Sequence, residues 1–358
     1  MIPLKKVILF VVFLFLFCPI TQASTATATS YVLMDMTTAR VLQGKNYHTP
    51  MLIASISKIM TCTLAIESAN LDKMITVDDI IKQSYGSGIY IEVGEQMSLR
   101  DLLYGLMLRS GNDAALVIAK FVGGTVEDFV KMMNQKAKEI GMNHTLFRNP
   151  SGLDESDLGN YSTAYDMALL TKYAMQKKEY RTIVHTKKHT VKTNKKTYIW
   201  HNKNKLLNES YITGGKTGYT EKAKRTLVST ASADHMNLIV VTLKDSDDWN
   251  THKSLYEYAF NTYQAYQILR KNNFQVIGER EYQKKGTLYI KKDLYLLFKK
   301  DELPSLVAKI NLSKNKTLKN HEQVGTYDIY LGKERLYQEK IYFQKNKGSS
   351  LIKKRSLF

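Results

Sequence analysis

Three short motifs along the chain contain the residue types of a serine–lysine acyl-transfer site. They occupy residues 55–58 (Ser-Ile-Ser-Lys), 110–112 (Ser-Gly-Asn) and 216–218 (Lys-Thr-Gly), in that order. A serine hydroxyl becomes an effective nucleophile when a base removes its proton, and a desolvated lysine amine is such a base. The order and separation of the three motifs therefore predict a nucleophilic serine that is activated by a lysine.

The first motif differs from other copies of the same pattern by its context. Ser-x-x-Lys occurs three times in the chain, at residues 55, 313 and 350. Only the first copy opens an apolar run with helical spacing, which predicts a buried helix that starts at Ser55. Positions i and i+3 share a helix face, so the Lys58 amine can reach the Ser55 hydroxyl. The other copies lie in lysine-rich polar stretches that are typical of a solvated surface.

The motif residues can be given separate chemical roles. Burial, the helix N-terminus and the charge of Lys216 would lower the pKa of Lys58, so that its amine is neutral and accepts a proton. The backbone N–H groups of Ser55 and Tyr219 are the expected oxyanion donors. Lys216 and Thr217 would bind a substrate carboxylate, the first by its charge and the second by a hydrogen bond. No metal is required for this chemistry.

The N-terminal residues 1–23 have the features of a signal peptide. Two lysines precede an almost wholly apolar run over residues 7–17, and Thr-Gln-Ala at residues 21–23 is a suitable cleavage site. The run is shorter than the roughly 20 residues of a typical membrane-spanning helix. A cleaved signal peptide would mean that the protein is exported. The alternative is that residues 1–23 stay attached as an uncleaved anchor. Cleavage would leave Cys62 as the single cysteine, which excludes an internal disulfide and a cysteine metal cluster.

The net charge is strongly positive and unevenly distributed. The whole chain carries +19, and residues 276–358 contain 19 Lys and Arg against 9 Asp and Glu. On an exported protein, a basic segment indicates an anionic partner surface such as lipid headgroups or wall polymer. Export argues against nucleic acid as a partner. A soluble basic domain without such a partner is the alternative.

The periodicity of apolar residues predicts an α+β fold for residues 24–275. A hairpin is expected at residues 31–42, and helices at 55–66, 99–108, 113–119, 125–140, 163–175 and 249–269. Two strongly apolar strands at residues 226–231 and 238–243 flank a turn. Strands thus lie at both ends of a helical block. This order predicts one antiparallel sheet with flanking helices and a helical subdomain beside it.

The remaining chain reads as a small all-β domain with a basic tail. Short strands separated by polar turns are expected at residues 287–290, 294–298, 307–310, 327–330 and 339–343. We place this domain at residues 276–344. The tail, residues 345–358, has five Lys and Arg, no acidic residue, and interspersed apolar residues. It is a candidate for peripheral membrane contact, and a frayed terminus is the alternative.

The chain resembles the D-alanyl-D-alanine carboxypeptidases, which are low-molecular-mass penicillin-binding proteins of the β-lactamase and transpeptidase-like superfamily. The resemblance covers most of residues 24–270 and extends beyond the three motifs. It is carried by residues 54–61, 106–115, 149–154 and 161–168. Residues 214–232, with Lys224 where many relatives have glycine, are similar to the sporulation-associated branch of the family.

The resemblance implies roles for the motif residues that agree with those assigned above. Ser55 would form an acyl-enzyme with release of D-alanine, Lys58 would be its base, and Ser110 would relay protons. Asn112 would hold the substrate amide, and Lys216 would bind the carboxylate. The implied substrate is the peptidoglycan pentapeptide stem, with β-lactams as covalent inhibitors and with no metal or cofactor. The implied role is to limit cross-linking during maturation of the cell wall or spore cortex.

Two other functions share part of this pattern. A class A β-lactamase has the same three motifs but adds a glutamate and an asparagine four residues apart. Here Glu155 and Asn160 are five apart, within a segment that resembles carboxypeptidases. A non-catalytic wall-binding or β-lactam-sensing protein would need binding but no turnover. The intact Ser55, Lys58 and Ser110 argue against that alternative. Relatives often have histidine at the position of Asn160, for which the sequence suggests no catalytic role.

Overall fold

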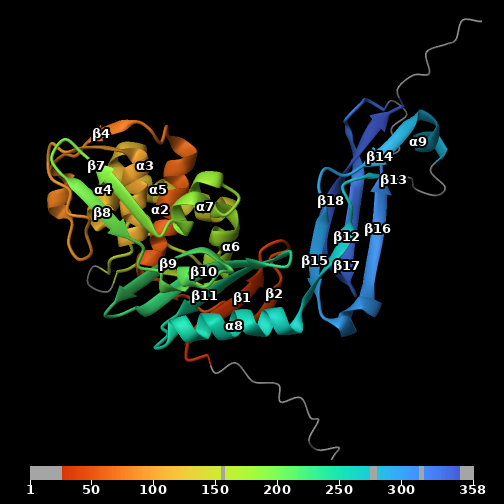
Figure 1. Cartoon of the computed structure of the whole chain (residues 1–358), viewed down its shortest axis with the longest axis horizontal. Helices are drawn as coiled ribbons and strands as arrows, with labels where there is room; N and C mark the ends of the chain where they lie inside the picture. Colours follow the sequence, from red (N-terminus) through yellow and green to blue (C-terminus); the bar gives the residue numbers. More distant parts are fainter. Residues whose placement is uncertain (1–25, 155–157, 275–279, 314–317, 347–358) are drawn as a thin grey trace, which may run out of the picture.

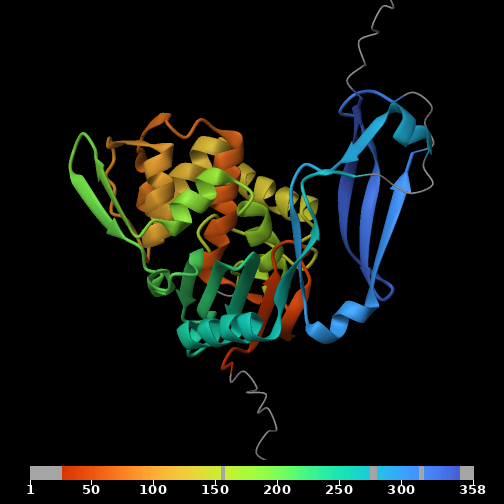
Figure 2. The same ribbon diagram turned by 45° about the vertical axis from the view of Figure 1, so that its right-hand side comes forward.

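The chain folds into an α/β part followed by an elongated part that is mainly β-strand, as Figures 1 and 2 show. The structure is a computed structural model that describes residues 26–154, 158–274, 280–313 and 318–346. The expected signal peptide and nearly all of the expected basic tail lie outside the described residues. The combination of an antiparallel sheet, flanking helices and a C-terminal β domain confirms the α+β fold class.

The central sheet joins strands from both ends of the α/β part. It has five strands in the order β2-β1-β11-β10-β9, and all their pairings are antiparallel. Ser30 of β1 pairs with Leu243 of β11, so segments far apart in the sequence lie side by side. The strands are β1 (Ser30–Asp35), β2 (Val41–Lys45), β9 (Ile212–Thr220), β10 (Lys224–Ala233) and β11 (Met236–Leu243).

Alternation of apolar residues along these strands gives the sheet two buried faces. Val32, Val228 and Val241 pack in the core cluster shared with the helical block. Their neighbours Leu33 and Leu227 pack on the opposite face, in the cluster that includes Leu255 and Tyr256 of α8 (Asp248–Thr262). A helix therefore covers one face and the helical block covers the other (Figure 1).

The helical block is built around a buried central helix, α2 (Lys58–Ser68), whose first eight residues are all buried. The other helices pack around it: α3 (Leu99–Tyr104), α4 (Asn112–Gly123), α5 (Val126–Glu139), α6 (Ala164–Ala174) and α7 (Lys178–His185). A π-helical turn spans Gly105–Arg109. Short strand pairs complete the block: β3 (Met51–Leu52) with β6 (Tyr161–Ser162), β4 (Met74–Thr76) with β5 (Gln96–Ser98), and β7 (Lys188–Lys192) with β8 (Thr197–His201).

The C-terminal part contains two antiparallel sheets. One has two strands, β12-β15, and the other has five, in the order β13-β14-β18-β17-β16. All five strands expected from the sequence are present. The elements are β12 (Gln264–Leu269), β13 (Asn273–Phe274), α9 (Arg280–Lys285), β14 (Gly286–Tyr289), β15 (Leu294–Phe298), β16 (Leu306–Leu312), β17 (Gln323–Leu331) and β18 (Glu334–Lys345).

Two expected element boundaries are wrong. The helix expected to start at Ser55 begins as a 3-10 turn over Ala54–Ser57, and α-helical geometry starts at Lys58. The helix expected to continue to residue 269 ends at Thr262, and the following residues form β12, which pairs with β15. The apolar residues after Thr262 therefore contribute to the C-terminal part and do not extend α8. The apolar periodicity did not predict α7, the β7–β8 hairpin or α9.

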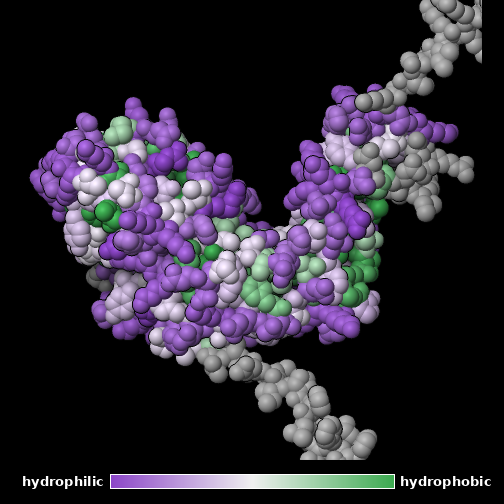
Figure 3. All heavy atoms as spheres, viewed as in Figure 1, coloured by the Kyte–Doolittle hydropathy of each residue, from purple (hydrophilic) through white to green (hydrophobic). Residues whose placement is uncertain are grey.

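The surface is mainly hydrophilic on the side shown in Figure 3, with an apolar area on the outer side of the C-terminal part. In the C-terminal part, Val307 and Ile310 of β16 are exposed. Within the described ranges, no helix combines the length and the apolar character needed to cross a bilayer.

Candidate active site

Ser55 lies on a tight turn that is held by contacts from Gly152 and Thr226. Ala54, immediately before it, has a positive φ of 49°, and the Gly152 backbone packs so closely that a Cβ there would lie 1.9 Å from the Ala54 carbonyl oxygen. The Thr226 hydroxyl of β10 donates to the Ile53 carbonyl oxygen at 3.0 Å. Ser55 is the only residue of the 3-10 turn that is not buried. The turn therefore exposes one hydroxyl on a constrained backbone.

Lys58 lies directly beneath this hydroxyl and is fully buried. Its Nζ is 3.0 Å from the Ser55 Oγ, 2.7 Å from the Asn112 Oδ1 and 2.6 Å from the Ser151 carbonyl oxygen. Burial holds the pKa of Lys58 well below its usual range, and the charge of Lys216 lowers it further. The amine is thus both within hydrogen-bond reach of the serine and inclined to be neutral.

Ser110 and Lys216 form the second contact between the motifs. Ser110 follows the π-helical turn in a left-handed conformation, with φ of 65°. Lys216 Nζ donates to the Ser110 Oγ at 3.1 Å and to the Thr217 carbonyl oxygen at 2.7 Å. Lys216 is buried, and burial together with the nearby charge of Lys203 lowers its pKa to about 7. A buried amine whose pKa is about 7 therefore lies beside the Ser110 hydroxyl.

Strand β9 places the third motif against the nucleophile turn. A Cβ on Gly218 would lie 2.9 Å from the Ser55 backbone nitrogen, so this close approach requires glycine. Ser55, Asn112 and Tyr219 line one cavity of about 340 Å³, together with Gly86, Ser87, Leu153, Asp154, Thr220, Glu221 and Lys222. Thr217 is half-buried on the same strand. The structure thus brings together all the residues that the sequence analysis selected.

Asn112 is more constrained than the sequence suggested. Its Oδ1 accepts from Lys58, and its Nδ2 donates to the Tyr85 carbonyl oxygen at 2.6 Å. Its backbone N–H donates to the Ser87 carbonyl oxygen at 2.8 Å. The next residue, Asp113, accepts the backbone N–H groups of the same loop, including Tyr90 at 2.7 Å. Asn112 therefore links the lysine base to the loop that forms one wall of the cavity.

Asn160, for which the sequence suggested no catalytic role, supports the loop beside Lys58 from outside the cavity. It is fully buried, and its Nδ2 donates to the Ser57 Oγ and the Asn149 carbonyl oxygen, both at 2.9 Å. Its Oδ1 accepts from the Arg148 backbone N–H at 2.7 Å. These bonds fix the loop that presents the Ser151 carbonyl to Lys58. The resemblance marked this position as unusual, but no local sequence signal showed what it contacts.

We expect Asn160→Ala to reduce the rate of acylation by penicillin by about tenfold, because a displaced active-site group commonly costs one to two orders of magnitude. The Ser151 carbonyl stabilises the protonated form of Lys58, so its displacement should also move the acidic limb of the pH–rate profile to lower pH. Stopped-flow acylation between pH 5 and 9 measures both effects. Asn160→His, a polar side chain of suitable size, should restore part of the rate. An unchanged limb in Asn160→Ala would show that the residue contributes only to stability.

Comparison with known proteins agrees with this geometry. A family model described as D-alanyl-D-alanine carboxypeptidase matches residues 19–247. A second, described as penicillin-binding protein 5, C-terminal domain, matches residues 263–348. The chain is similar to the D-alanyl-D-alanine carboxypeptidase DacF of Bacillus subtilis, with 34% identity over 256 residues, covering 68% of this chain and 65% of that protein. The match therefore spans slightly less than two thirds of DacF.

Two further relatives cover more of their own length. DacC of Escherichia coli, also a D-alanyl-D-alanine carboxypeptidase, is 32% identical over 276 residues, covering 71% of this chain and 68% of that one. The solved structure of penicillin binding protein 5 from Haemophilus influenzae superposes with a TM-score of 0.72 at 25% identity. That superposition covers 91% of this chain and 99% of the solved one, so it includes both parts of the molecule.

Proposed function

The chain belongs to the D-alanyl-D-alanine carboxypeptidase family of serine-type peptidases, and from this premise we propose that it removes the terminal D-alanine from peptidoglycan pentapeptide stems through an acyl-enzyme on Ser55. The observation that carries the proposal is the 3.0 Å contact between the Lys58 Nζ and the Ser55 Oγ. A neutral amine at that distance accepts the hydroxyl proton as the oxygen attacks.

In the first step, the Ser55 Oγ bonds to the carbonyl carbon of the penultimate D-alanine, and Lys58 takes the proton. The negative charge that develops on the carbonyl oxygen is stabilised by the backbone N–H groups of Ser55 and Tyr219. The bond to the terminal D-alanine then breaks, and its amine receives a proton through Ser110. Free D-alanine leaves, and an ester to Ser55 remains.

In the second step, water replaces the leaving amine. Its oxygen bonds to the ester carbonyl carbon while its proton passes to Lys58 or Ser110, and the Ser55 oxygen regains a proton as the ester breaks. Lys216 and Thr217 hold the carboxylate of the terminal D-alanine before cleavage. Asn112 orients the substrate amide from the loop side of the cavity. All these groups belong to the protein chain, and none of the steps calls for a metal or cofactor.

β-Lactams enter the same scheme because their strained amide presents a carbonyl to Ser55. Ring opening leaves a penicilloyl ester whose departing nitrogen stays attached, so it blocks the approach of water. The β-lactamase alternative requires a residue that drives deacylation efficiently. Asn160 does not serve this purpose, because its side chain is buried against Ser57 and Asn149 and does not line the cavity.

The test is mass spectrometry of the full mature protein incubated with a pentapeptide ending in D-Ala-D-Ala and, separately, with penicillin. We expect free D-alanine, together with a stable penicilloyl adduct that maps to Ser55. Rapid hydrolysis of penicillin without release of D-alanine would identify a β-lactamase. A stable adduct without peptide turnover would identify a sensing or wall-binding protein. Either result would overturn the proposal.

We also propose that the enzyme acts outside the cytoplasm and limits cross-linking of the cell wall or spore cortex. The export signal expected at residues 1–23 supports the location, and the similarity of residues 214–232 to the sporulation-associated branch supports the cortex. We propose peripheral membrane contact through the basic tail on the basis of its charge alone. Deletion of the gene should raise the pentapeptide content of muropeptides from the affected wall layer.

A further inference from the structure

Positive charge is concentrated on one segment of the α/β part, outside the C-terminal region. Residues 177–205 contain ten Lys and Arg and a single Glu. This segment comprises α7, the β7–β8 hairpin and the turn that follows the hairpin. Its net charge is +9, which nearly equals the +10 of residues 276–358, although that region is much longer. The remaining chain is therefore close to neutral, and the segment stands out as a separate cationic feature.

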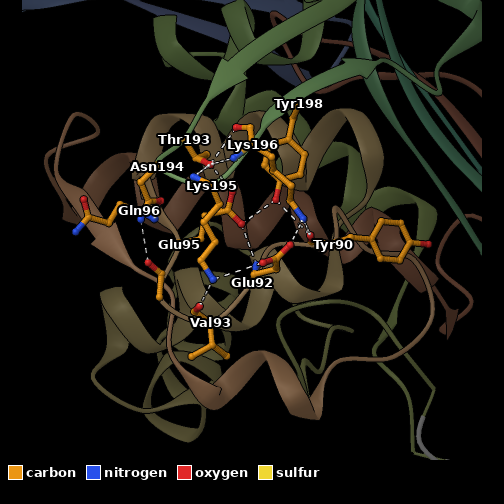
Figure 4. A network of polar contacts seen from close by, with 11 residues as sticks. Tyr90, Glu92, Val93, Glu95, Gln96, Thr193, Asn194, Lys195, Lys196 and Tyr198 are labelled. Carbon is orange, nitrogen blue, oxygen red and sulfur yellow. Dashed lines mark hydrogen bonds and ion pairs between the residues drawn. The ribbon is translucent and has the colours of Figure 1, made fainter.

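The tip of the hairpin is bonded to the neighbouring loop of residues 90–96, as Figure 4 shows. The buried Glu95 accepts from the Tyr198 hydroxyl at 2.8 Å and from the Thr193 hydroxyl at 2.6 Å. Lys195 and Lys196 both form ion pairs with Glu92. The charges at the tip are thus compensated by acidic residues of the neighbouring loop. These bonds make the hairpin a fixed platform.

The base of the hairpin differs, because within the described part of the chain Asp101 contacts His189 and no carboxylate is paired with the lysines there. Lys187, Lys188, Lys203 and Lys205 are exposed where the two strands meet the domain, and Arg109 reaches the same point. Arg109 donates to the carbonyl oxygen of His201. His201 in turn pairs with Lys188 on the neighbouring strand. Among the described residues, none of these five cations forms an ion pair with a carboxylate. We call the five residues the basal cationic patch.

The patch carries like charges close enough to affect one another. Partial burial and then the charge of Arg109 lower the pKa of Lys203, and burial followed by the charge of Lys203 lowers the pKa of Lys216. Such crowding is unfavourable unless an anion offsets it. The substrate carboxylate can offset the charge of Lys216, but it leaves the cations of the patch without a counter-charge. The arrangement therefore fits a second anionic partner that binds beside the active site.

The form of the patch indicates an extended partner. None of its five residues lines the 340 Å³ cavity, so the partner would lie along the surface. Its cations come from three separate segments: Arg109 ends the π-helical turn, Lys187 and Lys188 lie at the start of β7, and Lys203 and Lys205 follow the end of β8. A linear chain with one negative charge in each repeating unit can pair with cations that are distributed over several segments in this way.

A lipid surface is the competing partner, and the distribution of apolar residues disfavours it. Interfacial binding combines cations with apolar side chains that enter the membrane. The exposed apolar residues near the hairpin are Tyr90 and Val93 at the tip and Ile199 on β8, whereas the uncompensated charges are at the base. We propose that the basal cationic patch binds a linear phosphodiester polymer, so that the enzyme is retained next to its substrate. Binding of the polymer does not depend on the reaction proposed for Ser55, whereas retention next to the substrate rests on the proposed function.

The test compares two triple variants of the full-length protein that each lose three exposed lysines. Lys187→Gln/Lys188→Gln/Lys205→Gln alters the patch, and Lys309→Gln/Lys333→Gln/Lys340→Gln alters the C-terminal part. Binding to poly(glycerol phosphate) is measured by sedimentation or calorimetry between 50 and 200 mM salt, conditions chosen because charge-driven binding weakens with salt. Phosphatidylglycerol vesicles are the second probe, and penicillin labelling checks that each variant is folded.

We expect the patch variant to bind the polymer at least tenfold more weakly at low salt than the control variant does. The slope of log K against log salt should fall by about three, since three lysines are lost and each lost phosphate contact removes close to one unit. Release of D-alanine from a soluble pentapeptide should be unchanged. Equal polymer binding by the two variants would overturn the proposal. So would tighter binding to vesicles through the same lysines, or a selective loss of kcat/KM for the soluble peptide at low salt.

Discussion

Replacement of Ser55 by alanine is expected to reduce D-alanine release by about 10⁴-fold or more, to the background rate, and to abolish the penicilloyl adduct. Residues that act together with a nucleophile cannot compensate for its loss, so removal of the nucleophile alone commonly eliminates the whole covalent contribution. Among the described residues, the Ser55 hydroxyl is the only hydroxyl that Lys58 Nζ contacts. Peptide turnover measured by D-alanine detection, and labelling measured by intact-protein mass spectrometry, provide the two readouts.

The chain supplies a matched control for this experiment. Ser313 begins a second Ser-x-x-Lys sequence, in the C-terminal part and in a polar context. Ser313→Ala should therefore leave both readouts at the level of the unaltered protein. Thermal unfolding of Ser55→Ala shows whether the fold is retained. Release of D-alanine by a folded Ser55→Ala at the original rate would refute the assignment of the nucleophile.

The second large effect concerns pH and depends on two lysines with opposite requirements. Lys58 must be neutral to accept the serine proton, so kcat/KM rises as the pH increases through its lowered pKa. Lys216 must be charged to bind the carboxylate, so kcat/KM falls as the pH increases above its pKa of about 7. The result is a bell-shaped profile whose limbs belong to the coupled pair. Above pH 8 the activity should decrease about tenfold per unit.

Lys216→Arg separates this explanation from a general loss of stability. The guanidinium remains charged throughout the accessible range, so the alkaline limb should disappear up to at least about pH 9 even if the maximal rate is lower. Lys216→Gln should raise KM by about 100-fold, because it removes the charge that faces the carboxylate. Lys309→Arg, on an exposed strand, should leave the profile unchanged. Persistence of the alkaline limb in Lys216→Arg would assign it to another group.

The sequence predicted the parts of the fold in which periodicity and capping agree. Thr125 caps α5 through the Asp128 backbone N–H, as the capping pattern indicated, and β10 and β11 follow their apolar runs. The β7–β8 hairpin was missed because its inward residues alternate with lysine and threonine, which suggested a polar surface segment. The end of α8 was misplaced because the residues after Thr262 remain rich in aromatic side chains, which suit a helix or a strand equally.

The sequence predicted the site residues that belong to a recognisable motif and act through their side chains. It did not predict contacts that are made by backbone carbonyl groups. Ser55, Lys58, Ser110 and Lys216 meet in the structure as their spacing suggested. The third acceptor of Lys58 is the carbonyl oxygen of Ser151, and a carbonyl is present at every position of every sequence. Its placement depends on the loop that Asn160 fixes across the core. Such contacts require three-dimensional coordinates.

The pairing of β1 with β11 has a consequence for how the enzyme becomes active. A chain made from its N-terminus contains the Ser55, Lys58 and Ser110 side chains early, but β1 has to wait for residues 236–243 before it gains its central partner. Closing so long a segment is slow, because its conformational entropy is lost before the pairing provides stability. Lys216 and the Gly218 contact arrive on β9 only shortly before that closure. The catalytic pocket is therefore complete only after β9 and β11 have been synthesised and have paired. A nascent or interrupted chain that lacks these strands carries the Ser55 nucleophile but remains inactive.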